Sequence, residues 1–139
     1  NIFVACRFND KEGKGRLLKH LKSKGYSPKD LSGNEVAKLH IKHMVGGRAP
    51  KAVTERGEYI FRVQFPERPG ALVGFLDKLS DKFNITLFHY RNQGSAYGRV
   101  LVGFESKGKD YSKLIQYLNE TGFRFWDETQ NLAYKSFLK

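Results

Sequence analysis

The order of secondary-structure patterns along residues 58–126 restricts the fold of this chain more than any other feature. Apolar and polar residues alternate at 58–65, which predicts a strand with one buried face. A tight turn at Pro69 and Gly70 precedes apolar residues with helical spacing. The predicted elements are, in chain order, strand 58–65, helix 69–83, strand 84–91, strand 97–105, helix 110–121 and strand 123–126.

This β-α-β-β-α-β order is that of the ferredoxin-like α+β fold, an antiparallel sheet with helices on one face. The start of the chain repeats the second half of the unit at a spacing of 97 residues, as from Asn34 to Asn131. Apolar patterns and turn residues in this part predict strand 1–8, helix 16–24 ended by Gly25, edge strand 26–31, and helix 35–45 capped by Ser32 or Asn34.

We therefore expect residues 1–33 to be the C-terminal half of a first module and residues 34–57 to be a linker helix with a basic loop. Residues 58–139 are expected to form a complete second module with a C-terminal tail. The first copy lacks its opening β-α-β, which roughly 40 upstream residues would supply, so we expect a fragment. The apolar strand 1–8 is expected to be buried by pairing with another chain or with the second sheet, which predicts a homo-oligomer.

The formal net charge of +11 permits nucleic-acid binding, but the lysines and arginines are spread along the 139 residues. This spread indicates a solvated basic surface. Residues 97–104 faintly resemble an RNA-recognition signature, yet Arg99 and Leu101 stand where aromatic residues would have to stack on bases. No run of residues is long enough to span a membrane.

The single cysteine, Cys6, cannot form an internal disulfide, which favours a reducing compartment. It is expected to be a small buried side chain within an apolar strand. His40 and His43 are expected to be a surface pair and not metal ligands, because no further ligands stand nearby. The sequence contains no recognisable triad, carboxylate pair or phosphate loop, so it gives no case for catalysis.

The corner at residues 67–72 is the candidate binding site. With Pro69 at the first helical position, Arg68 would be a poor N-cap, and the N–H groups of residues 70–72 would be open to a carboxylate. Glu67 or Asn84 would meet an ammonium group. The alternative is a strand–turn–helix corner without a ligand, in which Glu67 offsets the helix dipole and Asn84 is a turn residue.

Several blocks closely resemble the C-terminal regulatory domain of biosynthetic threonine deaminase (threonine dehydratase), a pair of ACT-like modules. The blocks lie in the same order and are residues 39–40, 44–48, 65–72, 84–91, 97–101 and 127–129. The resemblance implies a parent enzyme that uses pyridoxal phosphate, on a separate N-terminal catalytic domain, to convert threonine to 2-oxobutanoate and ammonia. No cofactor is expected on this part of the chain.

The resemblance also implies an amino-acid effector, with isoleucine as inhibitor and valine as possible activator of isoleucine biosynthesis. It implies partners in the protein's own catalytic domain and further copies, and neither nucleic acid nor membrane. The location would be cytoplasmic in a bacterium and mitochondrial or plastid in a eukaryote. Matching the motif places effector contacts at Glu67, Arg68, Gly70, Ala71, Leu72, Asn84, Leu87, Phe88, His89, Tyr90 and Arg91.

Two other classes stay open. One is an amino-acid-sensing ACT module of another metabolic enzyme. The other is a basic RNA-binding module of the ferredoxin-like fold, against which the missing stacking aromatics count. A lone strand histidine such as His89 is usually a core or interface residue, which is the alternative to its contacting a ligand.

Overall fold

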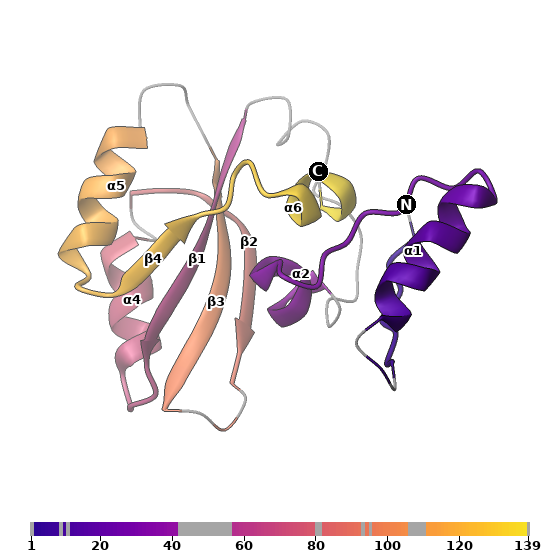
Figure 1. The fold of residues 1–139 in the computed structure, drawn as a ribbon. Helices are drawn as coiled ribbons and strands as arrows, with labels where there is room; N and C mark the ends of the chain where they lie inside the picture. Colours follow the sequence, from indigo (N-terminus) through magenta and orange to yellow (C-terminus); the bar gives the residue numbers. More distant parts are fainter. Residues whose placement is uncertain are drawn as a thin grey trace.

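The computed structural model describes residues 2–8, 10, 12–41, 57–79, 82–92, 94, 96–105 and 111–138. A four-stranded antiparallel sheet with strand order β2-β3-β1-β4 forms its centre (Figure 1). The strands are β1 (Glu58–Pro66), β2 (Ile85–Arg91), β3 (Tyr97–Glu105) and β4 (Arg124–Asp127). Helix α4 (Ala71–Leu79) follows β1, and helix α5 (Tyr111–Glu120) follows β3. The predicted α+β ferredoxin-like order is confirmed.

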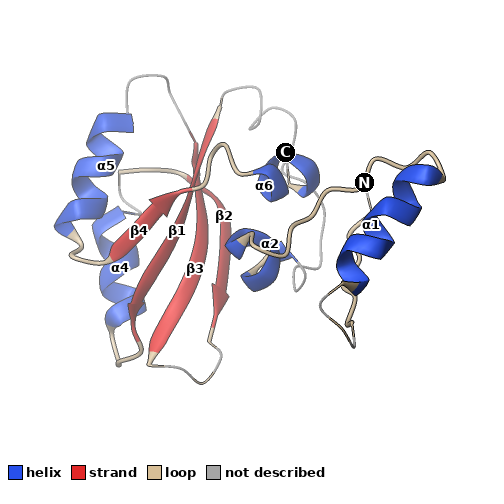
Figure 2. Cartoon of the chain, in the orientation of Figure 1, coloured by secondary structure: helices blue, strands red, loops and turns tan. Residues whose placement is uncertain are grey.

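Helices α4 and α5 cover one face of the sheet, as Figure 2 shows. Ala71, Phe75 and Leu79 recur every four residues along α4, so all three face the sheet and are buried. They pack on the inward residues of β1 and β3, among them Phe65 and Val100. Truncation of a buried phenylalanine such as Phe75 to alanine typically costs about 3–5 kcal/mol, so this core dominates the stability of the module.

The opposite face of the sheet is covered in part by two short helices, α2 (Glu35–Leu39) and α6 (Leu132–Phe137). Ile60 of β1 and Leu101 of β3 are fully buried against Val36 and Tyr134 of these helices. The expectation that strand 58–65 buries only one face is therefore wrong at this end of the sheet. The alternating pattern of strand 58–65 did not predict this burial, because helices α2 and α6 cover a face that is otherwise polar.

The N-terminal segment contradicts the predicted strand 1–8, since residues 2–8 form no strand. Ile2 and Val4 are 89% and 68% exposed, and Cys6 is exposed instead of buried. In the second module β3 and β4 both pair with β1. Among the described residues no equivalent strand lies beside 2–8, so its backbone groups have no ladder to join.

The rest of the first repeat is only partly as predicted. Helix α1 (Gly13–Ser23) begins three residues before the expected position 16 and ends at the turn of Gly25, whose φ of +82° favours glycine. Residues 26–31 form no strand, for the same lack of a pairing partner. Asn34 caps α2 as expected, but α2 ends at Leu39.

The remaining predictions for this region lie on residues that the structure does not describe. These are positions 42–45 of the expected helix and the basic loop up to residue 56. Among the described helices, none has both the length and the apolar character that crossing a bilayer requires.

Candidate functional site

The corner between β1 and α4 is tighter than predicted, and Pro69 is not its first helical residue. The N–H of Arg68 donates to Pro66 O (2.9 Å) and the N–H of Ala71 donates to Arg68 O (3.1 Å), so the chain turns twice before the helix begins. Gly70 carries the reversal with a φ of +81°. Helix α4 therefore starts at Ala71, and Gly70, not Arg68, is the residue before it.

This shift changes which backbone donors are open. The N–H of Ala71 is used within the turn, and the first helical bond runs from Gly74 N to Gly70 O (2.8 Å). Among the described residues, the amides of Leu72 and Val73 have no acceptor. These two N–H groups lie in the first turn of α4, at the end of the helix where the helix dipole favours an anion.

Glu67 precedes the turn that leads to these two amides, and hydrogen bonds to neighbouring parts of the sheet hold it in place. Its N–H donates to Ala96 O (2.9 Å), and its carboxylate accepts a hydrogen bond from the hydroxyl of Tyr90. That carboxylate raises the pKa of Tyr90, so the hydroxyl keeps its proton. The Tyr90 ring stacks on Phe65 with 6.1 Å between ring centroids. Glu67 is thus fixed at the corner by Tyr90 of β2 and by Ala96, the residue before β3.

Gly98 of β3 leaves the room that this arrangement needs. A Cβ atom at this position would strike the Glu67 carboxylate, and it would lie 3.0 Å from both the Tyr90 and Phe65 rings. Sequence reasoning did not assign Gly98 or Phe65 to the site. The available signal was the glycine between Tyr97 and Arg99 in an otherwise regular strand, since such glycines mark close approach of another group.

Apolar side chains flank the same corner. Leu72 is half-buried and packs against the core on the α4 face of the sheet. Tyr90 pairs with Val100, a core residue, so Tyr90 and Phe88 lie on this same face. Val73, in the first turn of α4, is exposed, and sequence reasoning did not single it out. The corner therefore combines two open amides, a fixed carboxylate and an apolar surface.

The other predicted site residues lie elsewhere. Asn84 precedes β2 at the far end of the sheet, where its Nδ2 donates to Glu105 Oε2 (2.9 Å). Leu87, His89 and Arg91 alternate with Phe88 and Tyr90, so they lie on the face covered by α2 and α6. The structure thus brings Glu67, Arg68, Gly70, Ala71, Leu72 and Tyr90 together, with Phe88 on the same face.

His40 is not the surface residue that the sequence predicted. It is fully buried, and its Nδ1 lies 2.8 Å from Nδ1 of His89, while His43 is outside the described residues. Burial, followed by the charges of His89 and nearby arginines, lowers the pKa of His40 to about 3. Among the described residues, no group of three or more histidines, cysteines or acids is arranged to hold a metal ion.

Comparison with known proteins identifies close relatives. The model of the C-terminal regulatory domain of threonine dehydratase matches residues 50–138. The biosynthetic L-threonine dehydratase IlvA of Escherichia coli is 45% identical over 138 residues, which are 99% of this chain and 26% of that protein. IlvA of Burkholderia multivorans is 40% identical over 138 residues, which are 99% of this chain and 27% of that protein.

The mitochondrial threonine dehydratase of Saccharomyces cerevisiae is 43% identical over 124 residues, which are 89% of this chain and 21% of that protein. The chain thus spans about a quarter of the length of its bacterial relatives. The matched region contains the whole sheet and the corner at Glu67, which confirms the predicted resemblance. This chain belongs to the family of the C-terminal regulatory domain of threonine dehydratase.

Proposed function

We propose that this chain is the effector-sensing part of a threonine dehydratase, and that the corner at residues 67–73 binds a branched-chain amino acid. Isoleucine would be the inhibitor and valine an activator, so that the product controls isoleucine biosynthesis. The observation that carries the proposal is that a fixed carboxylate, Glu67, and two open amides at the start of α4 flank one tight turn. An α-amino acid presents the complementary pair of charges on a single carbon atom.

The effector's carboxylate is assigned to the amides of Leu72 and Val73. Both amides belong to the first turn of α4, where partial positive charge accumulates. Gly70 carries no side chain, and the space beside its Cα is open, so a ligand can approach the backbone closely. The exposed side chain of Arg68 adds a positive charge next to the same turn.

The effector's ammonium group is assigned to Glu67. One oxygen of its carboxylate accepts from Tyr90, which fixes the orientation of the group and leaves the second oxygen to accept from the ligand. The branched side chain would lie against Leu72 and the apolar surface around it. A hydroxyl group on that side chain would lose its hydrogen bonds there, so threonine is expected to bind more weakly than isoleucine.

The remaining predicted residues receive other roles. Asn84 ties the start of β2 to Glu105 and is assigned a structural function. Leu87, His89 and Arg91 lie on the opposite face and do not contact this effector site.

The parent protein is proposed to be a homo-oligomeric, pyridoxal-phosphate-dependent threonine ammonia-lyase. Its catalytic domain would lie outside this chain, and no chemical step is assigned to the residues described above. The effector would act by changing how this domain packs against the catalytic domain. Bacterial and mitochondrial proteins are both among the relatives, so the proposed location is the cytoplasm in a bacterium and the mitochondrion or plastid in a eukaryote.

Calorimetric titration of the chain with isoleucine, valine and threonine tests the proposal. We expect isoleucine to bind, and Glu67→Gln to weaken binding by about 10- to 150-fold through loss of a charge-assisted hydrogen bond. Asp77→Asn is the matched control, because Asp77 is exposed in the second half of α4, away from the open amides of its first turn. Equal weakening by both variants, or no isoleucine binding at all, would refute this site.

A further inference from the structure

The sheet face that carries α2 and α6 also carries a row of arginines across its strands. Arg99 of β3 stands directly opposite Arg91 of β2, and on its other side it stands opposite Gln64 of β1. Because paired residues of neighbouring antiparallel strands share a face, Arg91 and Arg99 lie side by side. Neighbouring strands are about 4.8 Å apart, so these two arginines are close enough to bind one small ligand together.

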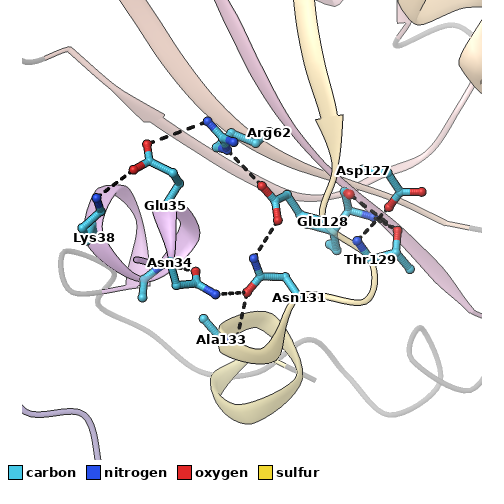
Figure 3. Close-up of polar contacts among 11 residues, drawn as sticks. Asn34, Glu35, Lys38, Arg62, Asp127, Glu128, Thr129, Asn131 and Ala133 are labelled. Atoms are coloured by element: carbon cyan, nitrogen blue, oxygen red, sulfur yellow. Dashed lines mark hydrogen bonds and ion pairs between the residues drawn. The ribbon is translucent and has the colours of Figure 1, made fainter. Parts of the chain in front are cut away.

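Arg62, the third arginine on this face, has its partners within the protein (Figure 3). Its Nε donates to Glu128 Oε1 (3.0 Å), its Nη1 lies 3.9 Å from Glu35 Oε2, and its guanidinium lies 4.2 Å from the Trp126 ring centroid. Glu35 is shared with Lys38, at 2.8 Å. The carboxylates of Glu35 and Glu128 are therefore already engaged with Arg62, Lys38 and Asn131, although the charge of Glu35 also acts on Arg99 over a longer distance.

Arg91 and Arg99 differ from Arg62 in having no such partners. Among the described residues, neither has a carboxylate within ion-pair distance. Arg91 is half-buried, and its Nε is enclosed without a hydrogen-bond acceptor in the described part of the chain. Like charges placed directly opposite each other destabilise a sheet, and a buried donor without an acceptor adds to that cost. Both costs disappear if an anion binds between the two side chains.

His40 supplies a second, independent sign of a ligand. Its side chain is fully buried, and its Nε2 has no hydrogen-bond partner among the described residues. His40 contacts His89, which lies two residues before Arg91 on the same face of β2, and Arg99 stands opposite Arg91, so the ring of His40 lies near this pair of arginines. If the Nδ1–H of His89 donates to His40 Nδ1, then His40 Nε2 carries a hydrogen and is a free donor.

We propose that Arg91, Arg99 and His40 form a binding site for a phosphate-type dianion, on the sheet face opposite the effector corner. The two unpaired guanidinium groups carry a charge of about +2, which a phosphate dianion neutralises and a single carboxylate does not. Guanidinium groups bind tetrahedral oxyanions through paired N–H donors. The donor of His40 would complete the site. The ligand is either inorganic phosphate or a phosphate monoester, which offer the same oxygens.

Titration calorimetry with inorganic phosphate and with methyl phosphate, at an ionic strength held constant with sodium chloride, tests the site. We expect saturable binding of one phosphate per chain. Arg99→Gln should weaken it by about 10- to 150-fold, since it removes charge-assisted hydrogen bonds. In chloride buffer the same variant should be no less stable than the wild type, because it also removes a like-charge contact.

Arg124→Gln is the matched control. Arg124 of β4 lies in the same cross-strand row, opposite Gln64, and is exposed, so this change removes the same charge two strands away from Arg99. It should change phosphate affinity by less than about twofold, because Arg124 is exposed and salt screens its charge from a phosphate bound at Arg99. Glu67→Gln should also leave phosphate binding intact, which separates this site from the effector corner.

Several outcomes would overturn the proposal. Equal losses with Arg99→Gln and Arg124→Gln would show general charge attraction, and an unchanged affinity with Arg99→Gln would show binding elsewhere. Failure of both phosphate compounds to bind would also refute the site. Binding of inorganic phosphate alone would support the site and identify inorganic phosphate as its ligand. Binding of both compounds would support the site and show that it also accepts a phosphate monoester.

Discussion

Asn34 donates a hydrogen bond from Nδ2 to Oδ1 of Asn131 at 2.8 Å, and these residues occupy equivalent positions in the repeat of 97 residues (Figure 3). Each one caps its own helix: Asn34 accepts from Ala37 N at 2.9 Å and Asn131 from Ala133 N at 2.8 Å. Equivalent residues that meet each other are the mark of an approximate two-fold relation. The repeat is therefore also a contact, which joins α2 to α6.

Breaking this contact should uncouple the two halves. Asn34→Ala removes a helix cap and the bond to Asn131, which should lower the free energy of unfolding by about 1–3 kcal/mol. In a double-mutant cycle with Asn131→Ala, measured by urea unfolding, we expect a coupling energy of about 0.5–1.5 kcal/mol. Asn119→Ala on the exposed side of α5 is the control and should stay within about 0.5 kcal/mol of the wild type. Strict additivity of the two changes would show that the contact is without consequence.

The buried His40 should make stability fall in mild acid. Its folded pKa of about 3 lies below the ordinary histidine pKa of 6.5, so the folded state disfavours protonation. The stability it contributes is fully present above pH 6.5 and is lost as the pH falls from there toward 3. Between pH 7.5 and pH 5 we expect a loss of about 2 kcal/mol from this residue.

Urea unfolding at the two pH values checks this expectation. His40→Leu keeps the site apolar and cannot titrate, so its stability should change less over the same range. His20→Gln, which removes an exposed histidine from α1, should keep the dependence of the wild type. A wild-type slope that His40→Leu leaves unchanged would assign the pH dependence to other groups.

The second module was predictable because local patterns and pairing partners agree there. Strand 58–65 alternates, helix α5 has an apolar stripe, and Gly122, directly after the predicted helix 110–121, takes a φ of +72°. The first repeat has the same patterns, but an apolar stretch such as residues 2–8 becomes a strand only beside another strand. Sequence patterns describe what a segment can form, and the pairing partner decides whether it does.

The site was predictable only near the corner. The proline–glycine turn and the following helix located the residues from Glu67 to Leu72. Residues along strand 84–91 were predicted to contact the effector together, yet their side chains alternate between the two faces of the sheet. Asn84 lies at the far end of the sheet from the corner. The close approach of Gly98 to the Tyr90 ring depends on strand register, which sequence reasoning did not predict.

Leu72 should control effector affinity. Leu72→Phe adds volume at the apolar side of the corner, and overpacking typically costs about 1–3 kcal/mol. We expect isoleucine binding to weaken by roughly 5- to 150-fold, with a smaller change in the thermal midpoint because Leu72 is only half-buried. Leu76→Phe, one turn further along the same side of α4, is the matched control and should leave isoleucine affinity unchanged. If Leu72→Phe lowers the midpoint and leaves affinity intact, Leu72 is a core residue only.

Two glycines on β3 offer the sharpest separation of binding from stability. A Cβ at Gly98 would strike Glu67 and lie 3.0 Å from the Tyr90 ring, on the face of the effector corner. A Cβ at Gly103 would meet Glu58 Oε1 at 2.6 Å and Ile60 Cδ1 at 2.9 Å, on the opposite face. Both changes to alanine should therefore destabilise the fold, by about 1–3 kcal/mol each.

Only Gly98→Ala should also displace the hydrogen-bonded pair of Glu67 and Tyr90 that we assign to the effector's ammonium group. We expect its isoleucine affinity to fall at least about tenfold, the effect of losing roughly 1.4 kcal/mol. Gly103→Ala should keep the affinity of the wild type despite its lower thermal midpoint. Calorimetry and thermal unfolding on the three proteins give both quantities. Equal affinity losses in the two variants would mean that binding merely follows stability, and the corner would lose its assigned role.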